Sequence, residues 1–534
     1  MAFSGPGGAI FAADSGWTVL LIAWLGGALL TLPLELLLRP ASRLRERPVA
    51  AWCIHFGLWS LLFSVLLLLT KRPVFAAGAG LTTILLVVLV NNAKHRALQE
   101  PFLFSDFGLF SQALRHPRLY LPFLGVGPAL TAAAAVMLAI YLGLTFEPPL
   151  PDRLGIGGFL MGTSAGLLLA AVLLGLGRRF APAPSLLPHE DLRALGLAAS
   201  LWLYWRLERQ RPHQAETTLP FALNTVDTDH LPDIVAVQSE SFCDGRRLWG
   251  GVRSELLTHF DRTLAGASRH GRLGVPAWGA NTMRTEFGFL TGISADRLGV
   301  HRFNPYRRYA RRPLLSLPAL LKTLGYYTVC IHPHPASFFS RDRVYPQLGF
   351  DEFIDVRQFD RSDTCGPYIC DAAVTRKIQQ ILDAATKPVF IFAITMENHG
   401  PLHLESVAPG DIEQLYTRAP PSDFSDLSVY LKHLLNADIM LSELSSTLGQ
   451  HRRGGLLCWF GDHVPSMPRV YANTGYNDAR TDYLIWRPAG GRARHQDLAV
   501  EQLAAALLAV AGLAGETTPS PARSPARDGG EPSR

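Results

Sequence analysis

Acidic and imidazole side chains stand at the ends of apolar runs in this chain, where they could bind a metal ion. The run that begins at Gly455 ends in Asp462-His463. A carboxylate oxygen and an imidazole nitrogen can together ligate a divalent metal. Short apolar runs are typical of buried parallel strands, and α/β enzymes place their chemistry at the carboxyl ends of such strands. The alternative is a surface turn with an exposed histidine.

Two more runs end in groups with complementary chemistry. Residues 233–239 predict a strand that places Glu240 at its carboxyl end, either as a metal ligand or as a solvated acid. Residues 388–395 predict a strand that is followed by His399. An imidazole there could hydrogen-bond a phosphoryl oxygen or transfer a proton. A purely structural role is the alternative for His399.

A further apolar run, residues 326–331, is followed by His332 and then by Arg341. The planar guanidinium group of an arginine suits a phosphate. The alternative for Arg341 is an ordinary ion pair with Asp342 or another nearby acid.

A hydroxyl-bearing segment lies between these predicted strands. Residues 279–290 predict a loop that enters a helix, with Asn281 or Thr282 as the cap. A helix amino terminus stabilises anions such as phosphate. A threonine near a metal ion can lose its proton and act as a nucleophile, which forms a covalent intermediate. A simple helix cap is the alternative for Thr282, and Thr285 is a second candidate nucleophile.

The elements that must position these residues form an alternating pattern. From about residue 231, short β-like runs alternate with helical stretches, which predicts an α/β domain with a mostly parallel central sheet. The carboxyl ends of parallel strands lie on one edge of a sheet, so groups that are scattered in sequence meet in space. We therefore expect one site, formed by Glu240, His332, His399 and Asp462-His463.

The first third of the chain carries most of its apolar excess. Of the 534 residues, 48% are hydrophobic and 18% are charged, so we expect a membrane domain joined to a soluble one. Five segments have the length and apolarity of transmembrane helices, namely residues 17–38, 51–70, 73–91, 121–144 and 156–177. The expected organisation is a transmembrane domain at 1–177, a juxtamembrane linker at 178–230, a catalytic domain at 231–514 and a disordered tail at 515–534.

The charge distribution bears on partners and on membrane orientation. The net charge of +6 comes from 50 basic and 44 acidic residues, and no basic run with interleaved aromatics indicates nucleic-acid binding. Basic residues crowd the first and third loops between the expected spans and follow the fifth span. The positive-inside rule therefore places the amino terminus outside and the large domain in the cytoplasm.

The six cysteines do not form a disulfide framework or a zinc-binding pattern. Only Cys365 and Cys370 lie in a turn-rich stretch where one local disulfide can form. Free thiols are the alternative for this pair. A disulfide would imply an oxidising compartment.

Taken together, these motifs resemble the lipoteichoic-acid-synthase type of phosphoglycerol transferase, a membrane branch of the alkaline phosphatase/sulfatase superfamily. The similarity covers the layout of five membrane spans before an α/β domain and the strand-end motifs from about 231 to 490. The matching family motifs in this chain are Glu240-Ser241-Phe242, Thr282 four residues before Glu286-Phe287, Asn398-His399-Gly400-Pro401 and Gly461-Asp462-His463.

The resemblance implies a role for each matching residue. The ligands of one divalent ion, manganese or magnesium with zinc as a further candidate, are implied to be Glu240, Thr282, Asp462 and His463. Thr282 would attack the phosphodiester of phosphatidylglycerol, release diacylglycerol and hold a glycerophosphoryl group until a glycan hydroxyl accepts it. The implied contacts of the phosphoglycerol are His399, Arg341 and His332.

The chain departs from the family pattern in one motif and conflicts with it in orientation. The family's Trp-x-Arg-Asp segment reads Phe339-Ser340-Arg341-Asp342 here. Family enzymes display the catalytic domain outside the bacterial cytoplasmic membrane, where lipid donors and glycan acceptors are met, whereas the charge count places it inside. We expect the outside location.

Other activities remain as alternatives. Transfer of phosphoethanolamine and hydrolysis of a phosphate or sulfate ester are close ones, and a non-catalytic membrane assembly protein is a remote one. A sulfatase needs a Cys/Ser-x-Pro-x-Arg setting for its nucleophile, which the stretch Thr282-Met-Arg-Thr lacks.

Overall fold

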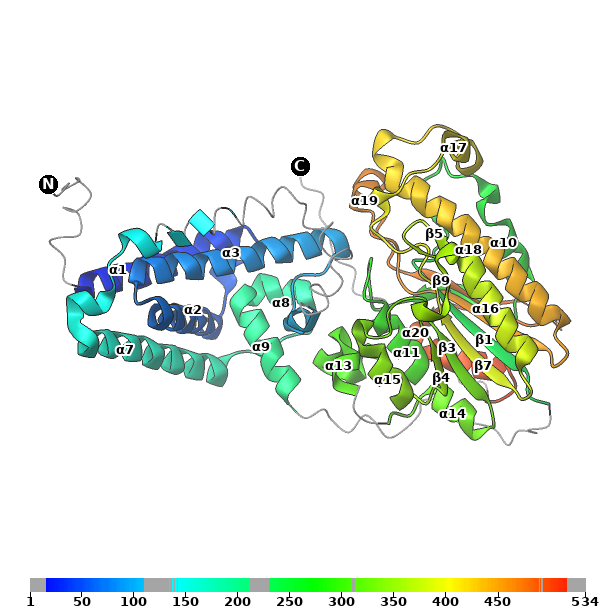
Figure 1. The fold of residues 1–534 in the computed structure, drawn as a ribbon, viewed down its shortest axis with the longest axis horizontal. Coiled ribbons are helices and arrows are strands. Elements are labelled where there is room, and N and C mark those ends of the chain that lie inside the picture. Colours follow the sequence, from blue (N-terminus) through cyan, green and yellow to red (C-terminus); the bar gives the residue numbers. More distant parts are fainter. Residues whose placement is uncertain are drawn as a thin grey trace. The chain divides into compact units, whose positions relative to one another are not determined.

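The computed structural model describes residues 16–109, 134, 137, 138, 140, 141, 143–210, 230–309, 313–488, 490 and 493–515. The chain divides into two compact units, Met1–Arg211 and Pro212–Arg534 (Figure 1). Each unit is described by itself below.

The amino-terminal unit is helical. Among its described residues, four helices are long and apolar enough to cross a membrane, namely α1 (Gly16–Leu36), α2 (Val49–Thr70), α3 (Pro73–Leu98) and α7 (Leu150–Phe180). Most of the expected span at 121–144 lies outside the described residues. The chain is therefore a multi-pass membrane protein by the length and composition of these helices.

Two shorter helices, α8 (Pro188–Leu195) and α9 (Leu197–Arg209), lie within the segment expected to be a linker. Ala199 and Leu203 of α9 are buried against Ala51 and Ile54 of α2. This apolar contact explains why the start of the segment is helical, although its Pro- and Arg-rich composition indicated a linker.

A buried ion pair joins the end of α1 to the segment before α2. Arg47 Nη2 donates to Glu35 Oε2 at 2.6 Å, and the two side chains are 0% and 3% exposed. His55 Nδ1 of α2 lies 3.5 Å from Glu35 Oε1. Buried charges are stable only when they are paired in this way.

The carboxyl-terminal unit contains the α/β fold expected from the sequence. Its main sheet has nine strands in the order β10-β2-β9-β8-β1-β7-β3-β4, with β11 paired to β2. The strands are β1 (Asp233–Ser239), β2 (Arg269–Gly274), β3 (Tyr327–Ile331), β4 (Glu352–Ile354), β7 (Val389–Ile394), β8 (Gly455–Gly461), β9 (Thr481–Trp486), β10 (Arg494–His495) and β11 (Leu498–Ala499). Five neighbouring strands are parallel to one another, namely β8, β1, β7, β3 and β4. Strand β9 is antiparallel to both of its neighbours, β8 and β2.

Helices cover both faces of this sheet, as Figure 1 shows. One face packs against α10 (Thr258–Ala265), α16 (Asp371–Ala384) and α18 (Ser425–Gln450), and the other against α11 (Thr282–Thr291), α14 (Leu317–Thr323), α15 (Arg341–Gln347) and α20 (Val500–Val510). Residues of β1 alternate between the two cores, since Val235 faces the first and Ile234 the second. A strand buried on both faces is mostly apolar, which is why β7, β8 and the middle of β1 read as apolar runs.

The remaining helices of this unit are short. They are α12 (Ala295–Leu298), α13 (Pro305–Tyr309), α17 (Pro409–Leu415) and α19 (Pro468–Thr474), and a small hairpin is formed by β5 (Thr364–Cys365) and β6 (Tyr368–Ile369). The order β3-β7-β1-β8 matters most for function, because the loops after these four parallel strands lie side by side on one edge.

Candidate metal and phosphoryl-transfer site

Three of the expected metal ligands converge at the carboxyl ends of β1 and β8. One ligand atom from each of Glu240, Asp462 and His463 lies within 4.8 Å of the others. His463 Nε2 is 3.2 Å from Asp462 Oδ2 and 3.6 Å from Glu240 Oε1. None of the three side chains is more than 3% exposed. Two alternatives are therefore wrong: Asp462-His463 is not a surface turn, and Glu240 is not a solvated acid.

Ser241 fixes the relative positions of the three side chains. Its backbone N–H donates to Asp462 Oδ1 at 2.8 Å, and its hydroxyl donates to Glu240 Oε1 at 2.9 Å. The same hydroxyl lies 3.3 Å from His463 Nδ1. Ser241 has a φ of 54°, a left-handed conformation that is costly for a residue with a Cβ. Sequence reasoning noted Ser241 only as part of a motif and assigned it no function.

The charge of this cluster fits a divalent cation. Burial raises the pKa of Glu240, the Asp462 carboxylate adds to this rise and His463 opposes it, which together bring the pKa to about 8. Asp462 Oδ2 is buried and accepts no hydrogen bond from the described residues. The raised pKa shows that two buried carboxylates are not both stable in their charged form here, and a bound cation would stabilise both charges. Glu240, Asp462 and His463 would hold such an ion.

Gly461 permits the close approach of the two loops that carry these ligands. A Cβ at this position would lie 1.9 Å from the carbonyl oxygen of Phe242. No side chain fits at that distance, so the glycine of Gly461-Asp462-His463 is needed for backbone packing.

The amino end of α11 is held beside the Asp462 loop by two hydrogen bonds. Gly279 N–H donates to Val464 O at 3.0 Å, and Thr285 Oγ1 donates to Asp462 O at 2.7 Å. Asn281, in a left-handed conformation, is the cap residue and Thr282 is the first residue of the helix. Thr285 is fully buried and its hydroxyl is bound to the backbone, whereas Thr282 is 8% exposed. This geometry favours Thr282 over Thr285 as the nucleophile.

His399, in the loop after β7, is oriented by neighbouring polar groups. Its Nδ1 lies 2.6 Å from Gly400 O and 3.3 Å from Tyr368 Oη. Because a carbonyl can only accept, Nδ1 carries the proton, and burial lowers the pKa of His399 so that the ring is neutral. Its Nε2 is therefore an acceptor, which suits a substrate hydroxyl better than the phosphoryl oxygen considered from the sequence.

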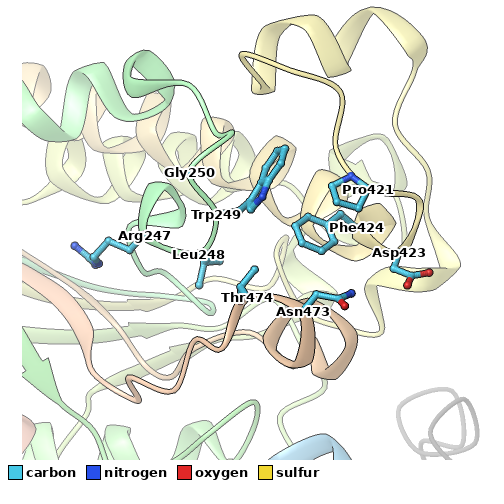
Figure 2. A pocket seen from close by; sticks show the side chains of 9 residues that line it. All are labelled: Arg247, Leu248, Trp249, Gly250, Pro421, Asp423, Phe424, Asn473 and Thr474. Carbon is cyan, nitrogen blue, oxygen red and sulfur yellow. The ribbon is translucent and has the colours of Figure 1, made fainter.

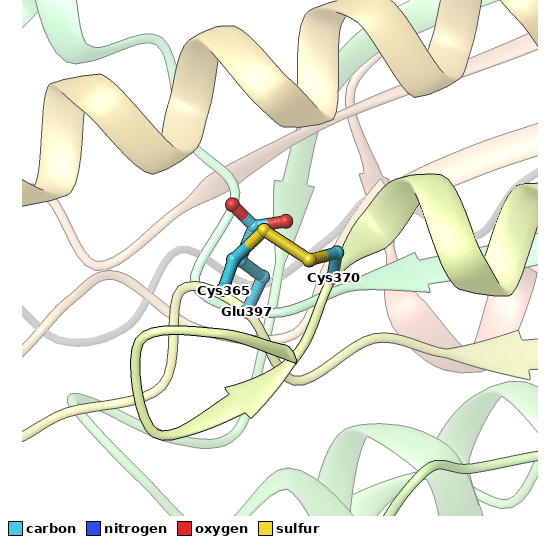
Figure 3. A group of neighbouring side chains, drawn as sticks. All are labelled: Cys365, Cys370 and Glu397. Carbon is cyan, nitrogen blue, oxygen red and sulfur yellow. A yellow bond between two sulfur atoms is a disulfide. The ribbon is translucent and has the colours of Figure 1, made fainter. Parts of the chain in front are cut away.

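A disulfide joins Cys365 and Cys370 and closes the hairpin that carries Tyr368. The sequence left both a disulfide and free thiols open for this pair, and the structure shows the disulfide. Figure 3 shows the Glu397 carboxylate beside this disulfide. The two sulfurs are bonded to each other, so this group of three residues offers no thiolate for a metal.

The loop after β7 is also braced from α18. Glu397 Oε1 lies 3.1 Å from His433 Nδ1, Asn436 donates to the same oxygen, and Asp371 N–H donates to Glu397 Oε2 at 2.7 Å. Sequence reasoning missed Tyr368, Glu397 and His433, because each acts through a partner far away in the chain.

Arg341 forms an ion pair at one side of the site. Its Nε donates to Glu286 Oε2 at 3.1 Å and its Nη2 also bonds Glu286, while the hydroxyls of Tyr306 and Tyr345 each donate to Glu286 at 2.6 Å. The pairing with a nearby acid is thus observed, and the acid is Glu286 instead of Asp342. The charge of Arg341 still reaches the site, since it lowers the pKa of Glu240 and of His399.

His332 follows β3 and is buried beside the same loops. Its Nδ1 lies 3.3 Å from Ile394 O. Burial lowers the pKa of His332 well below its ordinary value, and the charge of Arg341 lowers it further. The imidazole is therefore neutral.

Comparison with known proteins identifies the class. Residues 232–513 match the Sulfatase family, which is more than half of the 534-residue chain. The chain belongs to this family, within the alkaline phosphatase superfamily. Its amino-terminal helices are long and apolar enough to link this domain to a membrane.

Individual relatives agree with the resemblance seen in the motifs. The chain is 27% identical over 470 residues to the capsular polysaccharide biosynthesis protein RkpI of Rhizobium meliloti (strain 1021), covering 85% of this chain and 82% of that protein. It is 26% identical over 184 residues to lipoteichoic acid synthase 2 of Bacillus subtilis (strain 168), covering 33% of this chain and 27% of that protein. The fold is similar to that of the integral membrane lipooligosaccharide phosphoethanolamine transferase A (EptA) from Neisseria meningitidis, with a TM-score of 0.52, 12% identity, and 85% and 87% of the two chains covered.

Proposed function

We propose that this protein transfers glycerol phosphate from phosphatidylglycerol to a glycan of the bacterial cell envelope through a covalent intermediate on Thr282. The observation that carries the proposal is the placement of Thr282 at the amino end of α11, which two hydrogen bonds tie to the loop of Asp462 and His463. The similarity to a capsular polysaccharide biosynthesis protein and to a lipoteichoic acid synthase supports a glycan acceptor and a glycerophosphoryl group.

The first half of the reaction exchanges one ester bond for another. The Thr282 hydroxyl gives up its proton as its oxygen forms a bond to phosphorus, the bond from phosphorus to the diacylglycerol oxygen breaks, and that oxygen takes up one proton and leaves as an alcohol. The helix amino terminus of α11 stabilises the negative charge that develops on the phosphoryl group. The chemistry supplied by a divalent ion in such a site is further neutralisation of that charge and a lower pKa for the attacking hydroxyl.

The second half of the reaction restores the free hydroxyl of Thr282. An acceptor hydroxyl forms a bond to phosphorus, the bond to Thr282 breaks, and the threonine oxygen regains a proton. His399 Nε2, held as an acceptor by the contact of Nδ1 with Gly400, is suited to take the proton of an attacking hydroxyl. Membrane helices keep the domain near its lipid donor, which raises the local donor concentration.

We also propose that the catalytic domain lies on the periplasmic or extracellular side. The Cys365–Cys370 disulfide supports this side, since disulfides persist in oxidising compartments and are rare in the cytoplasm. The positive-inside count argues for the opposite side, so the orientation needs its own test.

The reaction is tested with detergent-purified protein, Mn²⁺ and phosphatidylglycerol labelled in the headgroup. Wild-type protein is expected to release diacylglycerol and to gain a glycerophosphoryl mass on the 270–297 peptide, located on Thr282. Thr282→Ala should lower diacylglycerol release by on the order of 10³-fold or more, as loss of a nucleophile does. Thr285→Ser, which keeps a hydroxyl, is the matched control and should retain the adduct.

Phosphatidylethanolamine is the parallel donor in the same assay. Cleavage of this lipid alone would replace glycerol phosphate by phosphoethanolamine in the proposal. Wild-type turnover by Thr282→Ala would rule out the covalent mechanism.

A further inference from the structure

A cavity of about 480 Å³ lies in the catalytic unit outside the ligand cluster. One wall is formed by Leu248 and Trp249 in the loop after β1, a second by Pro421 and Phe424, and a third by the end of α19. We call it the Trp249 pocket. Its volume is within the roughly 300–1,000 Å³ that is typical of small-molecule sites.

The Trp249 pocket is built on the same two segments that carry the metal ligands. The loop after β1 begins with Glu240 and continues to Trp249, and the segment after β8 begins with Asp462-His463 and continues to Thr474 at the end of α19. Both segments leave the carboxyl edge of the sheet. The pocket is therefore formed by segments that leave the same edge of the sheet as the ligand cluster.

The walls of the pocket are held in place by contacts between distant segments. Thr417 N–H donates to Gly251 O at 2.9 Å, and Val252 pairs with Tyr416 in an isolated β-bridge. The indole of Trp249 packs edge-to-face against Tyr416 at 5.6 Å and against Phe424 at 5.4 Å. The pocket is thus preformed, which lowers the entropic cost of binding.

The lining combines ring faces with hydrogen-bonding groups. Figure 2 shows Trp249, Pro421 and Phe424 gathered together, with Asn473 and Thr474 of α19 beyond them. A pyranose ring has the matching chemistry, because its C–H face packs on aromatic rings and its hydroxyl rim bonds amide, hydroxyl and carboxylate groups. Aliphatic lipid chains lack partners for these polar groups.

The charges around the pocket are mixed and give no net preference for an anionic ligand, and the Arg418 guanidinium lies over the Trp249 ring at 5.0 Å. The Arg247 guanidinium is engaged by Asp482 and Asp244, and the carboxylate of Asp423 is exposed at the pocket. A carboxylate accepts hydrogen bonds from sugar hydroxyls but repels a phosphate.

We propose that the Trp249 pocket binds a pyranose ring of the acceptor glycan and presents one of its hydroxyls to the glycerophosphoryl group on Thr282. The assignment of the sugar as an acceptor rests on the proposed function, since only a transferase needs an acceptor site. The binding of sugar is nevertheless measurable without any reaction.

Binding is tested on the full-length protein in detergent by calorimetry with neutral tetrasaccharides of glucose, galactose, mannose and rhamnose. We expect at least one of them to bind, and its affinity to fall at least tenfold in both Trp249→Ala and Asn473→Ala. Asn473 is exposed at the end of α19, so its variant keeps the fold even if the tryptophan variant does not. The inference is overturned if no tetrasaccharide binds, or if both variants bind like the wild type.

Trp486→Ala and Asp383→Ala are the matched controls. Trp486 ends β9, which is antiparallel to β8, and Asp383 lies near the end of α16, so both lie at the opposite edge of the sheet. Both controls should bind the tetrasaccharide with wild-type affinity. A loss of binding in the controls equal to that in Trp249→Ala would also overturn the inference.

A transfer assay separates this inference from the proposed function. With labelled phosphatidylglycerol and the tetrasaccharide that binds, Trp249→Ala should release the first equivalent of diacylglycerol at the wild-type rate but transfer at least tenfold less label to sugar. Failure of the wild type to cleave the lipid would contradict the proposed function and leave the binding result standing. Normal transfer by both pocket variants would contradict the pocket alone.

Discussion

Glu240 and Asp462 are two buried carboxylates that share one imidazole, and this arrangement sets the chemistry at the residue scale. Burial raises the pKa of Glu240, and Asp462 Oδ2 has no hydrogen bond from the described part of the chain. Such a cluster is poorly satisfied in the protein alone. Affinity for a divalent ion is the expected consequence.

The first prediction concerns this affinity. Glu240→Gln should weaken Mn²⁺ binding by more than about 100-fold, since loss of a supporting residue alone typically costs 10–100-fold. Ser241→Ala, which removes a hydroxyl bonded to Glu240, should fall in that smaller range. Calorimetric titration of metal-free protein measures both, with the exposed Glu443→Gln as the control. Equal affinity in Glu240→Gln and wild type would remove Glu240 from the ligand set.

A second prediction at this scale concerns Gly461. A Cβ there would overlap the Phe242 carbonyl, so Gly461→Ala must move the loop that carries Glu240. We expect a loss of about 1–3 kcal/mol in the free energy of unfolding, as for overpacked sites, together with weaker Mn²⁺ binding. Gly274→Ala is the control, because its added Cβ would lie 3.6 Å from the nearest atom, an ordinary contact. Chemical denaturation and metal titration should distinguish the two variants.

At the scale of elements, the short hairpin of β5 and β6 has a role that its size does not suggest. The Cys365–Cys370 disulfide closes it, and Tyr368 within it contacts the Nδ1 of His399. The hairpin therefore orients a side chain that belongs to the loop after β7.

We predict that Tyr368→Phe and Cys365→Ser each lower kcat/KM for the glycan acceptor by about tenfold, because His399 is proposed to take the proton of the acceptor hydroxyl. Both changes disturb the same contact, that of Tyr368 with His399, so the double variant should have a kcat/KM little lower than that of either single variant. Steady-state kinetics on the three variants provides the check. Multiplicative losses would show that the disulfide and the tyrosine act independently.

The buried ion pair between α1 and the α1–α2 loop gives a prediction for the membrane unit. Glu35→Gln leaves the Arg47 charge buried without its partner, which should cost about 3–5 kcal/mol of stability. Glu46→Gln breaks an ion pair with Arg43 in which the Glu46 side chain is 67% exposed and that of Arg43 is 56% exposed. This change should lower the stability by less than about 1 kcal/mol. Thermal denaturation of the two variants in detergent measures the difference. Similar melting temperatures would mean that the buried pair contributes no more than the exposed one.

At the scale of the whole molecule, the membrane orientation decides which substrates the domain meets. The basic loops favour a cytoplasmic domain, and the disulfide favours an oxidising compartment. The lipid donor and glycan acceptor of the proposed reaction agree with the disulfide.

We predict that alkaline phosphatase fused to the carboxyl terminus is active in intact cells. A fluorescent protein that folds only in the cytoplasm should show no fluorescence when it is fused at the same place. Fusions after α2 provide the internal comparison for the membrane unit. The reverse pattern would place the domain in the cytoplasm and contradict the proposed substrates.

The class of fold and the strand ends could be predicted from the sequence because both depend on local patterns. Apolar runs that are buried on both faces mark β1, β7 and β8, and parallel strands bring their carboxyl ends to one edge. The positions of Glu240 and Asp462 at the ends of such runs were therefore enough to predict that they lie together. Cys365 and Cys370 are close enough in sequence for a disulfide to be considered, but the sequence left free thiols open and the structure decided between the two.

What only the tertiary structure decided is how the neighbours of those residues are used. The pairing of Arg341 with Glu286, the bracing of Glu397 by His433 and the contact of Tyr368 with His399 each join segments that no local pattern relates. The same holds for Thr285, whose hydroxyl is bound to the Asp462 backbone and so leaves the nucleophile role to Thr282 in our proposal. Composition and periodicity determine which residues reach the edge of the sheet, whereas packing between distant loops determines which of their polar groups stay available for chemistry.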